Sequence, residues 1–163
     1  MPPRESTAAT PETTVPAAPA APPSFTYVAG RVDQGIRREL NRRLRPHGLS
    51  VPELTVLSVL ARRTGLSNAQ LARRSMVTPQ SMNQVLGSLE QRGLVERTSD
   101  PDHGRVRRTV LTREGAEVLA RAQESVDELE DEILGDLSPA QRALVLESLV
   151  HCMEKLSELS RDR

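Results

Sequence analysis

The sequence predicts a mainly α-helical protein with one small β-hairpin. After residue 23, apolar residues recur every three or four positions, which is the spacing of amphipathic helices. The pattern changes at residues 95–111, where short runs rich in β-branched residues flank a polar loop, as in a hairpin. With one Phe, one Tyr and no Trp, the core has to be built from Leu, Val, Ala, Ile and Met, which suits helices packed on helices.

Residues 1–23 are expected to form a disordered tail. They contain seven of the twelve prolines, and a segment of this composition has too little apolar surface to offset the entropy of ordering it. Pro2, Pro3 and Arg4 lead into no apolar run, so no signal peptide is predicted, and no later stretch has the length and apolarity of a membrane span. Because Cys152 is the single cysteine, no intramolecular disulfide can form, and we expect a cytoplasmic protein.

Capping signals mark where the helices of residues 24–163 begin. The first helix is predicted over residues 24–45, and Pro46 and Gly48 end it. Each later helix follows a Ser or Thr that caps free backbone N–H groups, and several of these caps have a Glu or Gln three residues on, which completes a capping box. The N-cap residues are Ser50, Ser67, Thr78, Thr112 and Ser138.

Two short helices joined by a tight turn at residues 75–77, the second of them over 78–92, lie directly before the hairpin. This order of elements is that of a winged helix-turn-helix, which we assign to residues 48–112. The helices in residues 24–47 and 113–163 are amphipathic, but a winged unit of this size is too small to cover their apolar faces. A second copy of the chain would cover them, so these two segments are predicted to form a homodimer interface.

The formal net charge is zero, but the charge is unevenly distributed. Residues 24–49 and 50–112 each carry a net charge of +4, whereas residues 113–163 carry −7. All but one of the basic residues are Arg, whose planar guanidinium suits phosphate and guanine. A basic middle of the chain beside an acidic C-terminal part favours double-stranded DNA as the partner.

The helix over residues 78–92 has the composition of a helix that reads DNA bases. Its apolar stripe, Met82, Val85, Leu86 and Leu89, is predicted to be buried, which leaves short neutral polar groups on the opposite face. Asn and Gln pair with adenine edges, and Ser pairs with several bases. An ordinary solvated face is the alternative interpretation. The DNA-binding candidates on and beside this helix are Arg74, Thr78, Gln80, Ser81, Asn83, Gln84 and Ser88.

The second strand and tip of the hairpin supply further candidates. Arg105, Arg107 and Arg108 lie within four positions, and an arginine at a wing tip reaches the minor groove or nearby phosphates. A solvated strand is the alternative. The wing candidates for DNA binding are His103, Gly104, Arg105 and Arg107.

Residues 66–115 read LSNAQLARRSMVTPQSMNQVLGSLEQRGLVERTSDPDHGRVRRTVLTREG. The capped helix, the segment LEQRGLVER, the wing with DP and the closing LTREG together resemble the MarR family of bacterial regulators. The resemblance implies a transcriptional repressor that binds a palindromic operator as a homodimer. The family often has an acidic residue two positions before the wing-tip arginine. Here His103 holds that position, so Asp100 or Asp102 would have to pair with Arg105 instead.

The resemblance also implies an effector. MarR relatives often bind small aromatic or anionic molecules between the dimerisation region and the winged domain. The candidate ligand-binding residues are Tyr27, Arg31 and Arg38, together with Arg37. The alternative is that these arginines are solvated or contact phosphates.

Other classes of function have less support in the sequence. The chain has no nucleotide-binding glycine loop, nucleophile elbow or metalloprotease motif, so no enzyme, catalytic residue or cofactor is predicted. His151 and Cys152 are adjacent and about 100° apart on a helix, so they cannot readily chelate one metal, and no metal site is predicted. Two alternatives stay open: a redox-responsive regulator acting through Cys152, and a winged-helix protein-interaction module that does not bind DNA.

Overall fold

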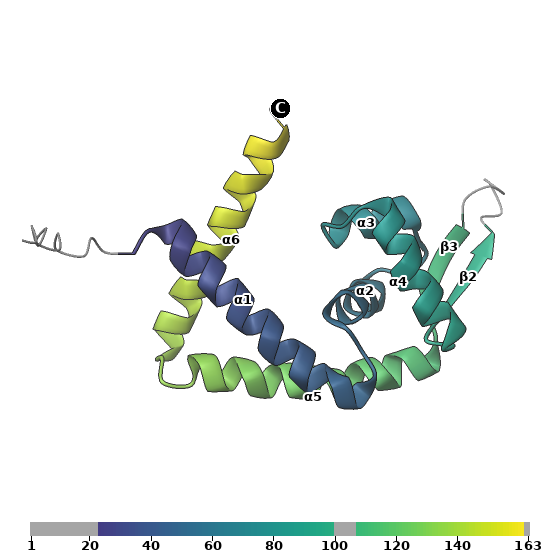
Figure 1. Cartoon of the computed structure of the whole chain (residues 1–163), viewed down its shortest axis with the longest axis horizontal. Helices are drawn as coiled ribbons and strands as arrows, with labels where there is room; N and C mark the ends of the chain where they lie inside the picture. Colours follow the sequence, from purple (N-terminus) through teal and green to yellow (C-terminus); the bar gives the residue numbers. More distant parts are fainter. Residues whose placement is uncertain (1–22, 100–106, 162–163) are drawn as a thin grey trace, which may run out of the picture.

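The computed structural model describes residues 23–99 and 107–161, which form six α-helices, one 3-10 turn and a small sheet (Figure 1). The predicted fold class, mainly helical with a hairpin, is therefore confirmed. The elements in chain order are α1 Phe25–Leu44, η1 Arg45–His47, α2 Val51–Arg62, β1 Leu66–Ser67, α3 Asn68–Arg74, α4 Pro79–Gln91, β2 Val95–Ser99, β3 Arg107–Leu111, α5 Arg113–Leu134 and α6 Pro139–Arg161.

The helices begin where the capping signals predict. Ser67 shows a complete capping box, because its hydroxyl accepts from the Gln70 N–H at 3.3 Å and its own N–H donates to Gln70 Oε1 at 2.9 Å. Thr78 and Thr112 likewise accept from the N–H groups three residues on. Glycine at positive φ follows the helical segment in two places, with Gly48 at 65° and Gly93 at 68°.

The sheet has three antiparallel strands in the order β1-β3-β2. The hairpin of β2 and β3 is the predicted one, whereas β1 is a strand that the sequence did not indicate. Leu66 pairs with Thr109 and Ser67 with Arg108, and a strand of two residues is too short to show any periodicity. Val106, which belongs to the predicted hairpin of residues 95–111, lies outside the described residues.

The core lies inside the winged unit of α2, α3, α4 and the sheet, and α5 closes it from one side (Figure 1). Val85, which was predicted to be buried with the α4 stripe, is only half-buried. It lies at the edge of the core, where it lines a cavity that faces α1. The most deeply buried large side chains are Leu44, Val56, Leu57, Leu71, Met82, Leu86 and Leu89.

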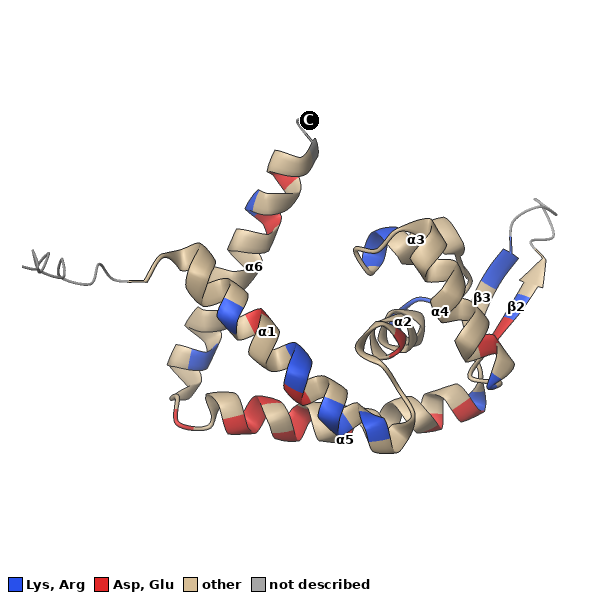
Figure 2. Ribbon diagram, in the orientation of Figure 1, with Lys and Arg blue, Asp and Glu red and all other residues tan. Residues whose placement is uncertain are grey.

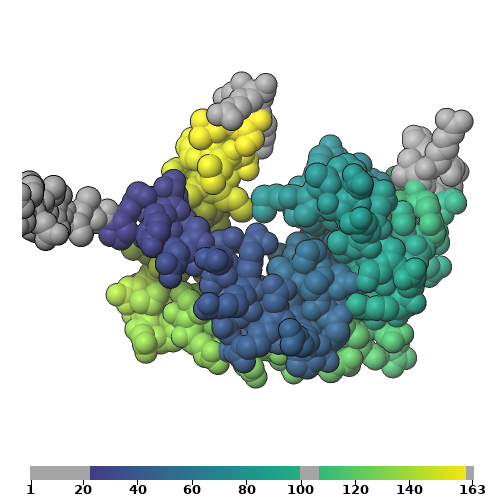
Figure 3. All heavy atoms as spheres, viewed as in Figure 1, coloured from purple at the N-terminus to yellow at the C-terminus, as the bar shows by residue number. Residues whose placement is uncertain are grey.

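Helix α6 projects away from the winged unit, and the end of α3 and the turn after it approach the side of α6 (Figures 1 and 3). No side chain in residues 139–160 is buried, although the helix carries apolar residues along its length. The first half of α1 and the end of α5 also expose apolar side chains. The exposed set is Phe25, Tyr27, Val28, Val32, Ile133, Leu144, Val145, Leu146, Leu149, Val150, Met153, Leu156 and Leu159.

Candidate nucleic-acid interface

Helix α4 presents a polar face because its apolar side chains pack into the winged unit. Met82, Leu86 and Leu89 are each at most 1 % exposed. The Thr78 hydroxyl accepts the N–H of Ser81 at 3.1 Å and lies 2.9 Å from its hydroxyl, which orders the first turn of the helix. The exposed residues of this face are Thr78, Gln80, Ser81, Asn83 and Gln84.

The amide side chains on this face are unengaged within the described part of the chain. Gln80, Asn83 and Gln84 have no hydrogen bond or ion pair to any described residue. Each amide offers two donors and one acceptor oxygen, and paired donor and acceptor groups are what an adenine edge requires. An exposed helix face with three such groups can bind base edges in a major groove.

Ser88 lies on another side of α4 from this polar face. Ser88 is half-buried, and its hydroxyl donates to Glu53 Oε1 at 2.7 Å. The sequence interpretation placed Ser88 on the exposed polar face because helical spacing alone cannot show a hydrogen bond to α2. The proposed reading face therefore omits Ser88.

Glu53 is a nearly buried carboxylate that joins the start of α2 to α4. Burial alone would raise the pKa of Glu53, but hydrogen bonds from the Ser50 N–H and from the hydroxyls of Ser88 and Ser50, with the charge of Arg92, outweigh it. The pKa of Glu53 consequently lies below its ordinary value. Arg92 also donates to the Gly48 carbonyl at 2.8 Å, so the C-terminal end of α4 is bound both to α2 and to the turn before it.

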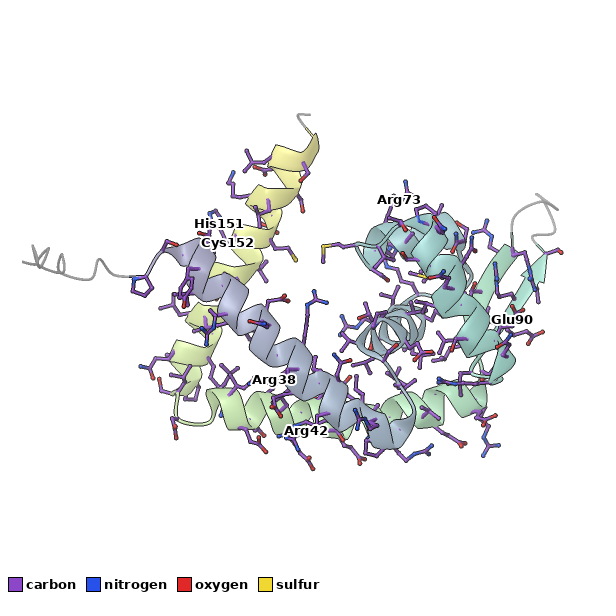
Figure 4. The ribbon with its side chains drawn as sticks, viewed as in Figure 1. Arg38, Arg42, Arg73, Glu90, His151 and Cys152 are labelled. Carbon is purple, nitrogen blue, oxygen red and sulfur yellow. The ribbon has the colours of Figure 1, made fainter. Side chains whose placement is uncertain are left out.

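Arg107 on β3 is bound to the end of α4. Its guanidinium donates to Glu90 Oε1 and to the Arg97 carbonyl, both at 2.9 Å, and Glu90 also lies 3.7 Å from Arg97 (Figure 4). Arg108 donates to the Gly65 carbonyl at 3.1 Å. These contacts join the hairpin to the helices. The predicted wing residues His103, Gly104 and Arg105 lie outside the described residues, so their part in DNA binding stays a prediction.

The turn between α3 and α4 contains the one positive-φ residue other than glycine in the described chain, Met76 at 52°. Its side chain is 83 % exposed. Arg74, which ends α3 just before this turn, is exposed as well. Asn68 at the start of α3 donates to the Pro79 carbonyl at 3.2 Å, which holds α3 against the first turn of α4.

A cavity of about 360 Å³ separates α1 from the winged unit. Apolar side chains of α1, α2 and α4 line much of it, and Arg37 and Arg74 add two guanidinium groups. Arg37 is paired with Asp33 at 2.9 Å. Of the predicted ligand-binding residues, Tyr27, Arg31 and Arg38 lie outside the cavity lining, because they project from other sides of α1 (Figure 4 labels Arg38).

The remaining candidates from the sequence lie apart from the polar face of α4. His151 and Cys152 are neighbours on α6 (Figure 4), and His47 Nε2 lies 3.0 Å from the Ser125 hydroxyl. Across residues 23–99 and 107–161, no cluster of three His, Cys, Asp or Glu side chains has the arrangement of a metal site. None of the described helices has the length and apolar character needed to span a bilayer.

Comparison with known sequences establishes the family. A sequence model of the MarR family matches residues 47–106. An HTH-type transcriptional repressor of Mycobacterium tuberculosis is 38 % identical over 116 residues, which cover 71 % of this chain and 84 % of the relative. The chain belongs to the MarR family, and it is a DNA-binding transcriptional regulator with a winged helix-turn-helix. The relatives are regulators and not enzymes.

Solved structures of the family share the fold. The regulator BldR of Sulfolobus solfataricus superposes with a TM-score of 0.73 at 26 % identity, covering 80 % of this chain and 93 % of BldR. CouR of Rhodococcus jostii RHA1, bound to p-coumaroyl-CoA, gives a TM-score of 0.70 at 25 % identity, covering 77 % and 88 %. A second CouR structure, bound to a 23-mer DNA duplex, gives 0.72 at 24 % identity, covering 80 % and 92 %.

Proposed function

We propose that the protein is a homodimeric repressor that binds a palindromic operator through α4 and is released from it by a small molecule. The observation that carries this proposal is the exposed face of α4. Gln80, Asn83 and Gln84 present amides that are unengaged within the described chain, on a helix fixed by three buried apolar side chains. Thr78 at the start of this face and Arg74 before it supply groups for phosphate.

The homodimer is supported by the apolar surface that the single chain leaves uncovered. Leu146, Leu149, Val150 and Met153 on α6 are each about half exposed, and a monomer with such a continuous apolar helix would be prone to association. A two-fold pair would bury these faces together with the start of α1. It would also set two α4 helices about 34 Å apart, matching successive major-groove faces of one duplex.

Release by a small molecule is supported by the cavity between α1 and the winged unit. A molecule there would touch both α1, which belongs to the proposed dimer interface, and Arg74 and Met76, which precede α4. Its lining is largely apolar, and because Asp33 already pairs with Arg37, Arg74 is the cation left to bind a small aromatic carboxylate. CouR, with the same fold, binds the anionic aromatic thioester p-coumaroyl-CoA.

The operator is the first thing to identify. The full chain would be incubated with a pool of random duplexes, and bound DNA would be sequenced and compared with the promoter region next to its own gene. We expect a palindrome whose half-sites are one helical turn apart, bound by two chains. Binding to all duplexes with equal affinity would overturn the proposal of a specific operator. Binding to none would overturn it as well and would favour the interaction-module interpretation.

Benzoate is a simple probe for the effector cavity. We expect it to raise the melting temperature of the protein and to weaken operator binding. Ile36→Trp should abolish both effects by filling the cavity, whereas Gln123→Trp, on the exposed side of α5, should not. Release by benzoate from the Ile36→Trp protein would place the effector elsewhere.

A further inference from the structure

We propose that four arginines beside the reading face, Arg62, Arg63, Arg73 and Arg74, form a second DNA contact that binds the phosphate backbone without reading sequence. We call this group the arginine patch. It deepens the proposed function, on which it rests, because it extends the DNA surface from α4 onto the ends of α2 and α3.

The patch is one surface although it comes from two helices. Arg62, Arg63 and Arg74 line one hollow of about 310 Å³ together with Val59, and Arg73 and Arg74 line an adjoining hollow of about 390 Å³ with Gln70. All four arginines are exposed. Figure 4 shows Arg73 on the outer face of α3. Arg74 lines both hollows, and it also borders the cavity that faces α1 and the hollow beside α6.

These arginines differ from most others in the described chain by having no carboxylate partner. Elsewhere Arg37 pairs with Asp33, Arg92 with Glu53 and Arg113 with Glu117. No ion pair or hydrogen bond joins any of the four patch arginines to another side chain in the described ranges. Their guanidinium groups are therefore free for an external anion.

The sequence around the patch keeps it free of negative charge. No acidic residue occurs between Glu53 and Glu90, a stretch that contains all four arginines and nearly all of α4. Figure 2 shows blue at the end of α3, whereas red gathers along α5. Gln70 Oε1 accepts the Ser67 N–H at 2.9 Å, and the Gln70 side chain adds no charge to its hollow. Glu154 and Glu158 of α6 face Arg74 from the other side, across a separate hollow.

A DNA duplex fits this surface better than a small anion does. Four charges spread over two hollows match a ladder of phosphates, since duplex DNA carries a charge about every 1.7 Å along its axis. The patch also continues directly into the reading face, because only residues 75–77 separate Arg74 from Thr78, the N-cap of α4. An arginine at such a place fixes the protein on the backbone but carries no sequence information.

The test uses full-length protein, the duplex selected by the wild-type chain and a scrambled duplex of the same length. Two variants, Arg62→Gln with Arg63→Gln and Arg73→Gln with Arg74→Gln, are compared over a series of salt concentrations. The matched control is Arg45→Gln on η1 with Arg121→Gln on α5, two exposed arginines that likewise have no side-chain partner in the described ranges. Helix α5 lies on the other side of the winged unit from α3 (Figure 1). Melting temperatures verify that all variants stay folded.

We expect each patch variant to weaken binding to both duplexes by the same factor. The slope of log K against log salt should become shallower by up to about 3.6 units per pair, because a homodimer loses two arginines from each of its two chains and each lost phosphate contact accounts for about 0.9. The control should keep the wild-type slope.

Unchanged slopes in both patch variants, with selective binding retained, would overturn the proposed phosphate contact of the arginine patch and leave the proposed function standing. Failure of the wild-type chain to bind any duplex would overturn both, and a loss confined to the selected duplex would make the patch a sequence reader.

Discussion

Ser88 of α4 donates a 2.7 Å hydrogen bond to Glu53 at the start of α2, and the same carboxylate is contacted by Arg92 one turn further along α4. The carboxylate thus fixes the rotation of α4 about its own axis. That rotation decides which side chains of α4 face outward, so a buried acid outside the polar face determines what this face presents.

Replacing Glu53 with Gln should destabilise the fold, because a neutral amide cannot accept from all four donors and turns its own NH₂ toward one of them. Hydrogen bonds to a charged group contribute about 1.5–3 kcal/mol, and we expect the free energy of unfolding to fall by about that amount. Urea denaturation measures it. Glu124→Gln, an exposed carboxylate on α5, is the control and should change little.

The contribution of Glu53 should also depend on pH in a defined direction. Its pKa is below the ordinary 4.5 in the folded protein, so its stabilising effect is complete above about pH 4.5 and is lost as the pH falls through the folded pKa. Wild-type protein should therefore lose stability more steeply below pH 4.5 than Glu53→Gln does. If the free energies of unfolding of the wild type and of Glu53→Gln fall in parallel as the pH is lowered, the Glu53 carboxylate does not accept these hydrogen bonds in solution.

The fold was largely predictable because its signals are local. Caps such as Ser67 with Gln70, and the spacing of Met82, Leu86 and Leu89, act within one helix and are visible in the sequence. What the sequence could not show depends on contacts between distant residues. The Ser88–Glu53 bond spans 35 positions, the two-residue strand at Leu66 exists only because β3 lies beside it, and the arginine patch needs the ends of two helices side by side.

Gln84 should contribute to discrimination between DNA sequences. Gln84→Ala removes an exposed, unengaged amide, and one good base contact is worth about 1–3 kcal/mol of discrimination. The ratio of selected-duplex to scrambled-duplex affinity should fall accordingly, as measured by fluorescence anisotropy. Gln91→Ala makes the same change at the far end of α4 and should keep the ratio. If the affinity ratio of Gln84→Ala equals that of Gln91→Ala, the exposed polar face of α4 does not read the DNA sequence.

Leu149→Asp should dissociate the proposed dimer. Leu149 is 52 % exposed in the single chain, and burying a leucine contributes about 1.5–3 kcal/mol. A two-fold interface contains it twice, so the dimer Kd should rise by roughly 10²–10⁴-fold. Sedimentation at micromolar concentration measures this. Ala120→Asp, on the exposed side of α5, should remain dimeric, and a dimeric Leu149→Asp protein would mean that α6 does not form the interface.

Met76 carries strain that a substitution should relieve. Its φ of 52° lies in the left-handed region, which costs a residue with a Cβ about 1–2 kcal/mol, while Asn tolerates this conformation better. The Met76 side chain is 83 % exposed, so shortening it removes almost no packing. We expect Met76→Asn to raise the free energy of unfolding by about 0.5–1 kcal/mol, less than the full strain because Asn keeps its Cβ. Calorimetry measures the change.

Ser75→Asn is the matched control. Ser75 has a φ of −95°, so its backbone has no left-handed strain to relieve, and the Ser75→Asn protein should not be stabilised. If both variants have the melting temperature of the wild type, the turn does not hold Met76 in the left-handed conformation.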